Sequence, residues 1–181
     1  MNRTRRPGLI WIGAAGLLGV VFLGYLTMVT GNVNKTGIRY SASDVVYGER
    51  VHASHEMMMD GAANTSNNLT ADASSEPEIQ VSEQFYDFGE VGANRALYHT
   101  FVIANLGQAP LLILHAYTTC GCTAADFTSA KIPPGKVALM TLQFDPGYNE
   151  MHGTTVRRGV MIETNDPERP LQEIWIQASV K

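Results

Sequence analysis

Thiols are scarce in this chain of 181 residues, which contains only two cysteines, Cys120 and Cys122. Because a single glycine separates them, no disulfide within one chain can join distant segments, and a small fold stapled by several disulfides is excluded. The sequence also lacks a phosphate-cradling glycine loop, a Ser/His/Asp constellation and a recognisable pair of catalytic carboxylates. With no recognised catalytic motif, we expect that the protein is not an enzyme.

Charged residues are absent from residues 8–30, a run dominated by aliphatic residues, glycine, alanine and aromatics. A membrane-spanning helix needs roughly 20 apolar residues, so this run is long enough to span. Arg3, Arg5 and Arg6 precede it, which places residues 1–7 in the cytoplasm and the remainder outside. The alternative is a cleaved signal peptide, but those have a shorter apolar region and a small-residue cleavage site. We expect an uncleaved single-pass anchor in the cell membrane, and cleavage of residues 1–30 stays open.

The formal net charge is −4, and three of the 13 basic residues lie in the predicted cytoplasmic tail. The exported part therefore carries 10 basic against 17 acidic residues, a net charge of −7. An acidic exported domain argues against nucleic acid or an anionic lipid surface as its partner.

Residues 31–76 are rich in Asn, Ser, Thr, Ala and Gly and have no sustained hydrophobic periodicity. Such a composition buries too little apolar surface to offset the entropy of ordering, so it predicts a flexible extracytoplasmic linker. The linker contains an unusual tract of soft metal-ligand types, namely His52, His55, Met57, Met58 and Met59.

From residue 77 onward the pattern changes to short stretches of apolar alternation separated by turn residues. The predicted strands cover residues 79–81, 86–88, 98–104, 111–114, 137–144, 155–163 and 171–180. Turn residues separate them at 105–107, 133–135, 145–147 and 165–167. About seven short strands in residues 77–181, with no convincing helix, predict an all-β, immunoglobulin-like antiparallel β-sandwich.

Several segments of this predicted sandwich occur in a characteristic order: 85–91, 99–101, 105–107, 110–111, 119–123, 132–135, 144–146 and 164–167. The series resembles the bacterial domain-of-unknown-function family 1573, related to the major-sperm-protein and ASH-type sandwiches. The resemblance covers roughly residues 77–181, and the Cys-Gly-Cys step with its flanking motifs is its most specific part. It implies an exported immunoglobulin-like domain and supplies no reaction.

The directions of the predicted strands indicate which side chains can meet the two cysteines. Gly121 between them permits a sharp turn, including backbone conformations with φ > 0. If strands alternate in direction, strand 110–117 delivers the cysteines to one end of the sandwich, and loop 145–154 returns there. We therefore expect these side chains to lie near one another: Cys120, Cys122, Met151 and His152, with His99 and His115 as weaker candidates.

Thiolate and thioether are soft ligands that select Cu(I), and imidazole is acceptable to it as well. Cys120 and Cys122 are therefore candidate Cu(I) ligands, with Met151, His152 and the tract in residues 52–59 as auxiliary ligands. Two other interpretations stay open. The cysteines can be small buried packing residues, or they can form a disulfide that exchanges with another thiol. Redox dithiols usually have Cys-x-x-Cys at a helix N-terminus, which disfavours the exchange interpretation here.

Two functions of different classes follow from these observations. The first is a membrane-anchored extracytoplasmic binding module that holds or transfers Cu(I) through the Cys-Gly-Cys motif. The second is an interaction or scaffolding domain that binds another protein of the cell envelope and has structural cysteines. A sandwich fold is compatible with both, so the fold alone does not choose between them.

Overall fold

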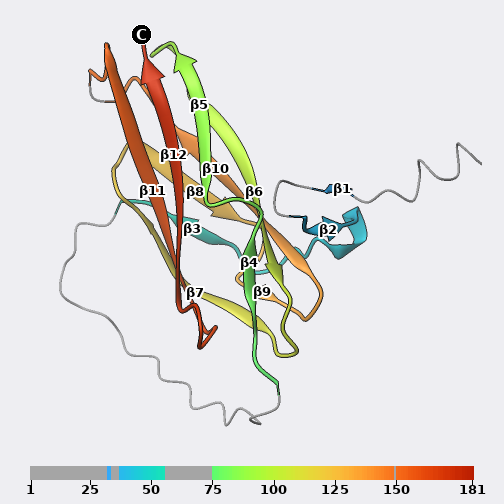
Figure 1. Cartoon of the computed structure of the whole chain (residues 1–181). Coiled ribbons are helices and arrows are strands. Elements are labelled where there is room, and N and C mark those ends of the chain that lie inside the picture. Colours follow the sequence, from blue (N-terminus) through green and yellow to red (C-terminus); the bar gives the residue numbers. More distant parts are fainter. Residues whose placement is uncertain (1–31, 34–36, 56–74, 149) are drawn as a thin grey trace, which may run out of the picture. The chain divides into compact units, whose positions relative to one another are not determined.

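The computed structural model describes residues 32–33, 37–55, 75–148 and 150–181 (Figure 1). The chain divides into two units, and the second of them, Val33–Lys181, contains the β-sandwich. The predicted membrane segment, residues 8–30, lies outside the described residues. Within the described residues, no helix is long and apolar enough to cross a membrane.

The sandwich consists of two five-stranded sheets, in the orders β3-β8-β10-β6-β4 and β5-β12-β11-β7-β9, which face each other in Figure 1. The strands of the first sheet are β3 (Val51–Ala53), β4 (Ile79–Val81), β6 (Leu97–Asn105), β8 (Thr123–Phe127) and β10 (Val137–Phe144). Those of the second are β5 (Phe85–Val91), β7 (Leu111–Thr118), β9 (Lys131–Ile132), β11 (Thr154–Thr164) and β12 (Leu171–Val180). Before them come β1 (Asn32–Val33), β2 (Arg39–Tyr40) and a short 3-10 helix η1 (Ala42–Asp44).

Alternating side chains of the two sheets fill the space between them. In β12, Ile174, Ile176 and Ala178 are completely buried, whereas the residues between them are partly exposed. Phe101 and Phe144, from the opposite sheet, are completely buried in the same core. This period-two burial pattern is what the sequence alternation predicted, and it confirms the sandwich architecture.

The sandwich is not purely antiparallel, because β5 pairs with β12 in parallel. The structure also contains strands β8 and β9, which the sequence pattern did not predict. The segment of β8 contains Ala124, Ala125 and Asp126, residue types with low strand propensity, and β9 has only two residues. Both form because neighbouring strands β10 and β7 provide backbone partners for them.

The prediction of a flexible linker throughout residues 31–76 is wrong for residues 37–55. This segment, here named the strap, runs along the edge of β8 and forms strand β3, whose Ala53 is completely buried. Backbone hydrogen bonds attach it at several points: Val46 N–H to Val137 O, Gly48 N–H to Thr128 O and Ala130 N–H to Glu49 O. Composition misjudged the strap because its backbone pairs with β8 and because its few apolar residues, such as Ile38 and Ala53, are buried against the sandwich.

Two buried polar side chains hold the end of the sandwich opposite to the cysteines. The amide of Asn105 donates to Ala109 O and Ile132 O. The carboxylate of Asp166 accepts backbone N–H bonds from Ile79, Glu168 and Arg169. These residues come from the predicted turns at 105–107 and 165–167, so the turn interpretation of both motifs is confirmed.

Candidate functional site

The two cysteines occupy the tight turn between β7 and β8, and they are joined by a disulfide with a Cα–Cα distance of 5.3 Å. The turn is held by oxygen and nitrogen atoms as well. Thr123 N–H donates to Cys120 O at 3.2 Å, and the Thr118 hydroxyl lies 3.0 Å from both Cys120 O and Thr123 O. The conformation of the turn therefore does not depend on the sulfur–sulfur bond alone.

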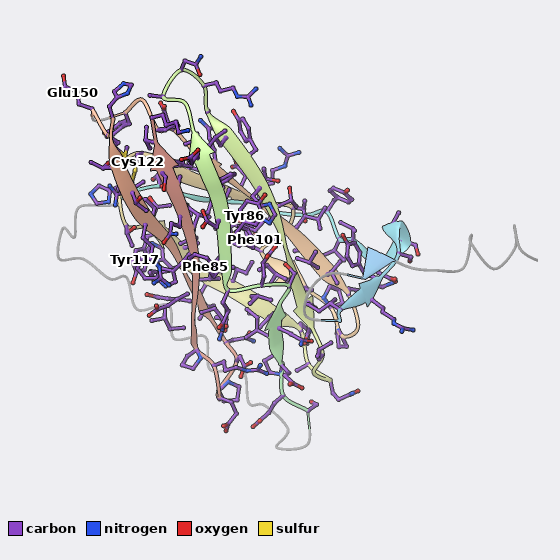
Figure 2. All side chains as sticks on the ribbon, turned by 45° about the horizontal axis from the view of Figure 1, so that its top comes forward. Phe85, Tyr86, Phe101, Tyr117, Cys122 and Glu150 are labelled. Carbon is purple, nitrogen blue, oxygen red and sulfur yellow. A yellow bond between two sulfur atoms is a disulfide. The ribbon has the colours of Figure 1, made fainter. Side chains whose placement is uncertain are left out.

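Loop 145–154 reaches the same end of the sandwich, as the strand directions predicted. Asp145 N–H donates to Cys122 O at 2.8 Å. In Figure 2, Cys122 lies toward the end of the sandwich at which Glu150, from this loop, is also found. We call the group formed by Cys120, Cys122 and their contacts from loop 145–154 and β11 the thiol pole.

Gly121 does not have the positive φ that the sequence analysis allowed for it. A Cβ atom at this position would instead meet the hydroxyl oxygen of Tyr148 at 2.6 Å. Tyr148 is itself 53% exposed. The glycine thus makes room for the end of an exposed tyrosine side chain that lies against the turn.

A cation lies directly against one of the two sulfurs. The Arg158 guanidinium donates from Nε to Cys122 Sγ at 3.3 Å. Its other nitrogens reach Arg157 O at 2.9 Å and Met151 Sδ at 4.0 Å. Met151 is 5% exposed and so belongs to the buried side of the thiol pole. Sequence analysis placed Met151 near the cysteines, and the structure does bring it to the guanidinium that contacts Cys122.

The two sulfurs have different surroundings. Cys122 is 4% exposed, whereas Cys120 is only partly buried. Cys120 Sγ accepts the Cys122 N–H at 3.2 Å and lies 3.4 Å from the Thr123 hydroxyl oxygen. The accessible sulfur therefore has neutral hydrogen-bonding neighbours, and the buried sulfur has the charged one.

The histidines predicted at this end have other contacts. His152 Nδ1 lies 3.0 Å from the Lys181 carbonyl oxygen. His99 Nε2 lies 2.8 Å from a carboxylate oxygen of Glu83, and its ring stacks on Tyr86 at 3.5 Å between centroids. His115 is paired with Glu163 in the ladder of β7 and β11, three residues before β7 ends. The structure does not place these three rings on the sulfurs.

The predicted linker contains the tract of candidate soft-metal ligands in residues 52–59. The structure describes the two histidines of this tract. His52, in β3, pairs with Asp126 at 2.8 Å, and His55 Nδ1 lies 3.2 Å from the carbonyl oxygen of Thr118. His55 thus contacts the backbone of Thr118, which precedes Cys120 by two residues at the base of the turn. Met57, Met58 and Met59 lie outside the described residues.

Over the part of the chain that the structure describes, no three His, Cys, Asp or Glu side chains converge in a group that could hold a metal ion. A metal at the thiol pole would therefore rely on the two cysteine sulfurs and on Met151, a donor type outside that set. The structure shows the oxidised cysteines, so metal binding by the reduced pair stays a prediction.

Arg158 is the functional residue that sequence reasoning missed. In β11, Val156, Val160 and Ile162 face the core, and Arg158 belongs to the same alternating series. The sequence does contain a signal for this residue. Because side chains alternate between the two faces of a strand, one arginine of the pair Arg157-Arg158 has to lie on the core-facing side. An arginine on the core-facing side of a strand indicates a negative or polarizable partner.

The family described as "Protein of unknown function (DUF1573)" matches residues 79–180, from β4 to the end of β12. The chain belongs to this family. The match contains the whole thiol pole described above, whereas the strap, residues 37–55, precedes the DUF1573 domain. No curated protein matches the chain significantly.

Among solved structures, the chain is similar to a protein of unknown function from Porphyromonas gingivalis W83, with 23% identity and a TM-score of 0.56. The match covers 62% of this chain and 51% of that one, so it supports the fold of the DUF1573 domain. A weaker match is the secreted serine protease VesC from Vibrio cholerae, with 11% identity and a TM-score of 0.43, over 58% of this chain and 23% of that one. The chain thus spans about half, or less, of the structures it matches.

Proposed function

We propose that the protein is a membrane-anchored, extracytoplasmic binding module whose Cys120 and Cys122, once reduced, hold one Cu(I) ion. The observation that supports this proposal is the pairing of both sulfurs in a turn that oxygen and nitrogen contacts also hold. Reduction of the disulfide leaves two thiol ligands on one preformed turn. The anchor and the export rest on the uncharged residues 8–30 and the preceding arginines.

The donor set at the thiol pole suits a soft monovalent ion. Two thiolates with Cu(I) form a unit of net charge −1, and two or three soft ligands are enough for this ion, whereas a structural zinc site requires four. The Arg158 guanidinium, 3.3 Å from Cys122 Sγ, compensates that negative charge. Met151 provides a thioether on the buried side, beside the same guanidinium.

Stabilisation of the fold by the disulfide is a poor explanation for the presence of the Cys-Gly-Cys motif. It closes a loop with a sequence separation of only 2 residues. By the chain-entropy relation, so short a loop stabilises the fold by about 1.6 kcal/mol, against roughly 3 kcal/mol for a loop of about 15 residues. A cross-link with so small an effect on the fold is better suited to a site whose sulfurs are used in turn as disulfide and as dithiol.

The copper content of the protein tests this proposal. Full-length protein, extracted in detergent and purified anaerobically with copper present, is expected to carry one copper for each pair of free thiols. Cys120→Ser and Cys122→Ser are expected to carry none, while His99→Gln retains the copper, since His99 contacts Glu83 and Tyr86. If both cysteine variants retain as much copper as the wild type, the proposal is overturned.

A second function, an interaction domain, is favoured by one observation on the outer face of the second sheet. The Arg157 guanidinium lies 5.2 Å from the ring centroids of both Phe85 and Trp175. Phe85 is 41% exposed, and aromatic residues with arginine are enriched at protein interfaces. Under this alternative, the substitution Phe85→Ser abolishes co-purification of an envelope partner and leaves copper content unchanged.

A further inference from the structure

The unequal environment of the two sulfurs has chemical consequences for the disulfide itself. In thiol–disulfide exchange, an incoming thiolate attacks one sulfur while the other leaves as a thiolate. The attacked sulfur must be accessible, and the leaving sulfur must be able to accept negative charge. At the thiol pole these two requirements are met by different cysteines.

Access favours attack at Cys120. This residue is partly exposed, while Cys122 is 4% exposed and belongs to the hydrophobic core cluster. Attack on Cys122 would require the incoming sulfur to enter the space that Arg158 and the core occupy. Attack on Cys120 proceeds from the solvent side of the turn.

Charge favours departure of Cys122. Arg158 Nε already donates to Cys122 Sγ at 3.3 Å, and the guanidinium is held in place by Arg157 O and Met151 Sδ. A positive group next to a sulfur stabilises its thiolate form. The neighbours of Cys120 Sγ, a backbone N–H and the Thr123 hydroxyl, are neutral and therefore stabilise a thiolate less.

The surrounding structure can survive opening of the bond. The contacts of Thr118 and the hydrogen bond from Asp145 N–H to Cys122 O hold the turn without the sulfurs. The strap also helps to hold the turn, because Thr118 N–H donates a hydrogen bond to Ser54 O. Reduction is therefore local, and the sandwich remains folded through the exchange.

We propose that the thiol pole exchanges disulfides with external thiols, with Cys120 as the attacked sulfur and Cys122 as the leaving thiolate stabilised by Arg158. An external thiolate bonds to Cys120 Sγ, the Cys120–Cys122 bond breaks, and its electron pair stays on Cys122. A second external thiolate then attacks the external sulfur of the mixed disulfide and releases the Cys120 thiolate. In total two external thiols are oxidised to one disulfide, and their two protons pass to the cysteines.

This exchange goes beyond copper binding, because it needs no metal, and each can fail without the other. It is also stoichiometric, so it does not turn the module into an enzyme. The Cys-x-Cys spacing without a helix disfavoured exchange at the level of sequence. Arg158 supplies the positive charge that a helix N-terminus supplies in other redox dithiols.

The attacked sulfur is identified on the unmodified full chain. Oxidised, metal-free protein in detergent, with a copper chelator present, is mixed with glutathione, quenched in acid, and analysed by peptide mass spectrometry. We expect the glutathione adduct on Cys120. An adduct found mainly on Cys122 would overturn the assignment, and this measurement requires no variant that has to fold.

The role of Arg158 is tested by the rate of reduction with glutathione. Arg158→Gln is expected to slow reduction about tenfold, because the leaving thiolate loses its charged partner, and Arg158→Lys restores part of the rate. The matched control is Arg157→Gln, since Arg157 lies on the opposite face, over Phe85 and Trp175, and its loss leaves the rate unchanged. Equal rates for Arg158→Gln and Arg157→Gln would contradict the proposed role.

Discussion

Arg158 donates a hydrogen bond from Nε to Cys122 Sγ at 3.3 Å, from the core-facing side of β11. Its neighbours in that series, Val156 and Val160, are buried apolar residues. A guanidinium on this side of a strand costs free energy unless its charge and its hydrogen bonds are satisfied. Arg158 is only partly buried, and the Cys122 sulfur, the Arg157 carbonyl and Met151 accept its hydrogen bonds, which places a positive charge beside one of the two cysteines.

The buried carboxylate of Asp166 stabilises the end of the sandwich opposite to the thiol pole. Asp166→Ala is expected to lower the free energy of unfolding by about 2–4 kcal/mol, because three backbone N–H groups lose their acceptor. Urea unfolding of the full chain measures this change. The control Asp126→Ala removes an exposed carboxylate paired with His52 and changes stability by less than about 1 kcal/mol. Equal losses for both variants would contradict the burial argument.

The strap depends on a small residue where it pairs with β8. Ala53 is completely buried, so Ala53→Glu would bury a carboxylate and is expected to release the strap, at a cost of about 3 kcal/mol or more. Limited trypsin digestion then cuts faster at Arg50, just before β3, while residues 79–180 stay intact. Ser54→Glu, at an exposed position of the same segment, serves as the control. Unchanged cleavage in Ala53→Glu would show that the strap docks without β3.

One contribution to the pH dependence of the strap comes from Asp44. Its hydrogen bond with Lys136, together with those from Ser41, holds the pKa of this carboxyl well below its usual range. Because the folded-state pKa is lowered, the stabilisation is present at neutral pH, falls progressively as the pH drops below the ordinary pKa of a carboxyl, and is fully lost below the lowered pKa. Lys136→Met is expected to raise the pKa of Asp44 toward the ordinary range, as followed by carboxyl NMR titration. An unchanged Asp44 titration in this variant would exclude Lys136 as the main cause.

Two glycines in characteristic motifs have different tolerance to a side chain. A Cβ atom at Gly107 would collide with the backbone of Glu76 and Glu78, so Gly107→Ala is expected to cost about 1–3 kcal/mol in unfolding free energy. At Gly121 the added atom meets only the end of the Tyr148 side chain, which is exposed and can move. Gly121→Ala should therefore cost less than about 1 kcal/mol in the same urea experiment. A larger loss at Gly121 than at Gly107 would contradict this comparison.

Alternation and turn residues were sufficient to predict the sandwich, because strands such as β12 bury every second side chain. They were not sufficient for β3, β8 and β9, which are short or poor in β-branched residues and form because an adjacent strand offers a backbone edge. Pairing partners that are distant in sequence leave no local pattern. The strap was therefore predicted as linker.

The candidate site was predictable to a similar extent. The spacing of Cys120 and Cys122 indicated that their sulfurs act together, and strand directions placed Met151 near them. The environment of His99 was not predictable, because its partner Glu83 comes from the connection between β4 and β5. Arg158 was missed because the sequence analysis considered only the residue types that bind soft metals, and arginine is not one of them.

A Cu(I) competition titration tests the central claim most directly. Reduced full-length protein is titrated anaerobically against the bicinchoninate complex of Cu(I), beside Cys120→Ser, Cys122→Ser, Met151→Leu and the oxidised protein. The account predicts that reduced protein withdraws one equivalent of Cu(I), that either cysteine variant loses at least about 100-fold in affinity, and that Met151→Leu loses less. Oxidised protein should withdraw none. Equal competition by wild type and Cys120→Ser would contradict copper binding at the thiol pole.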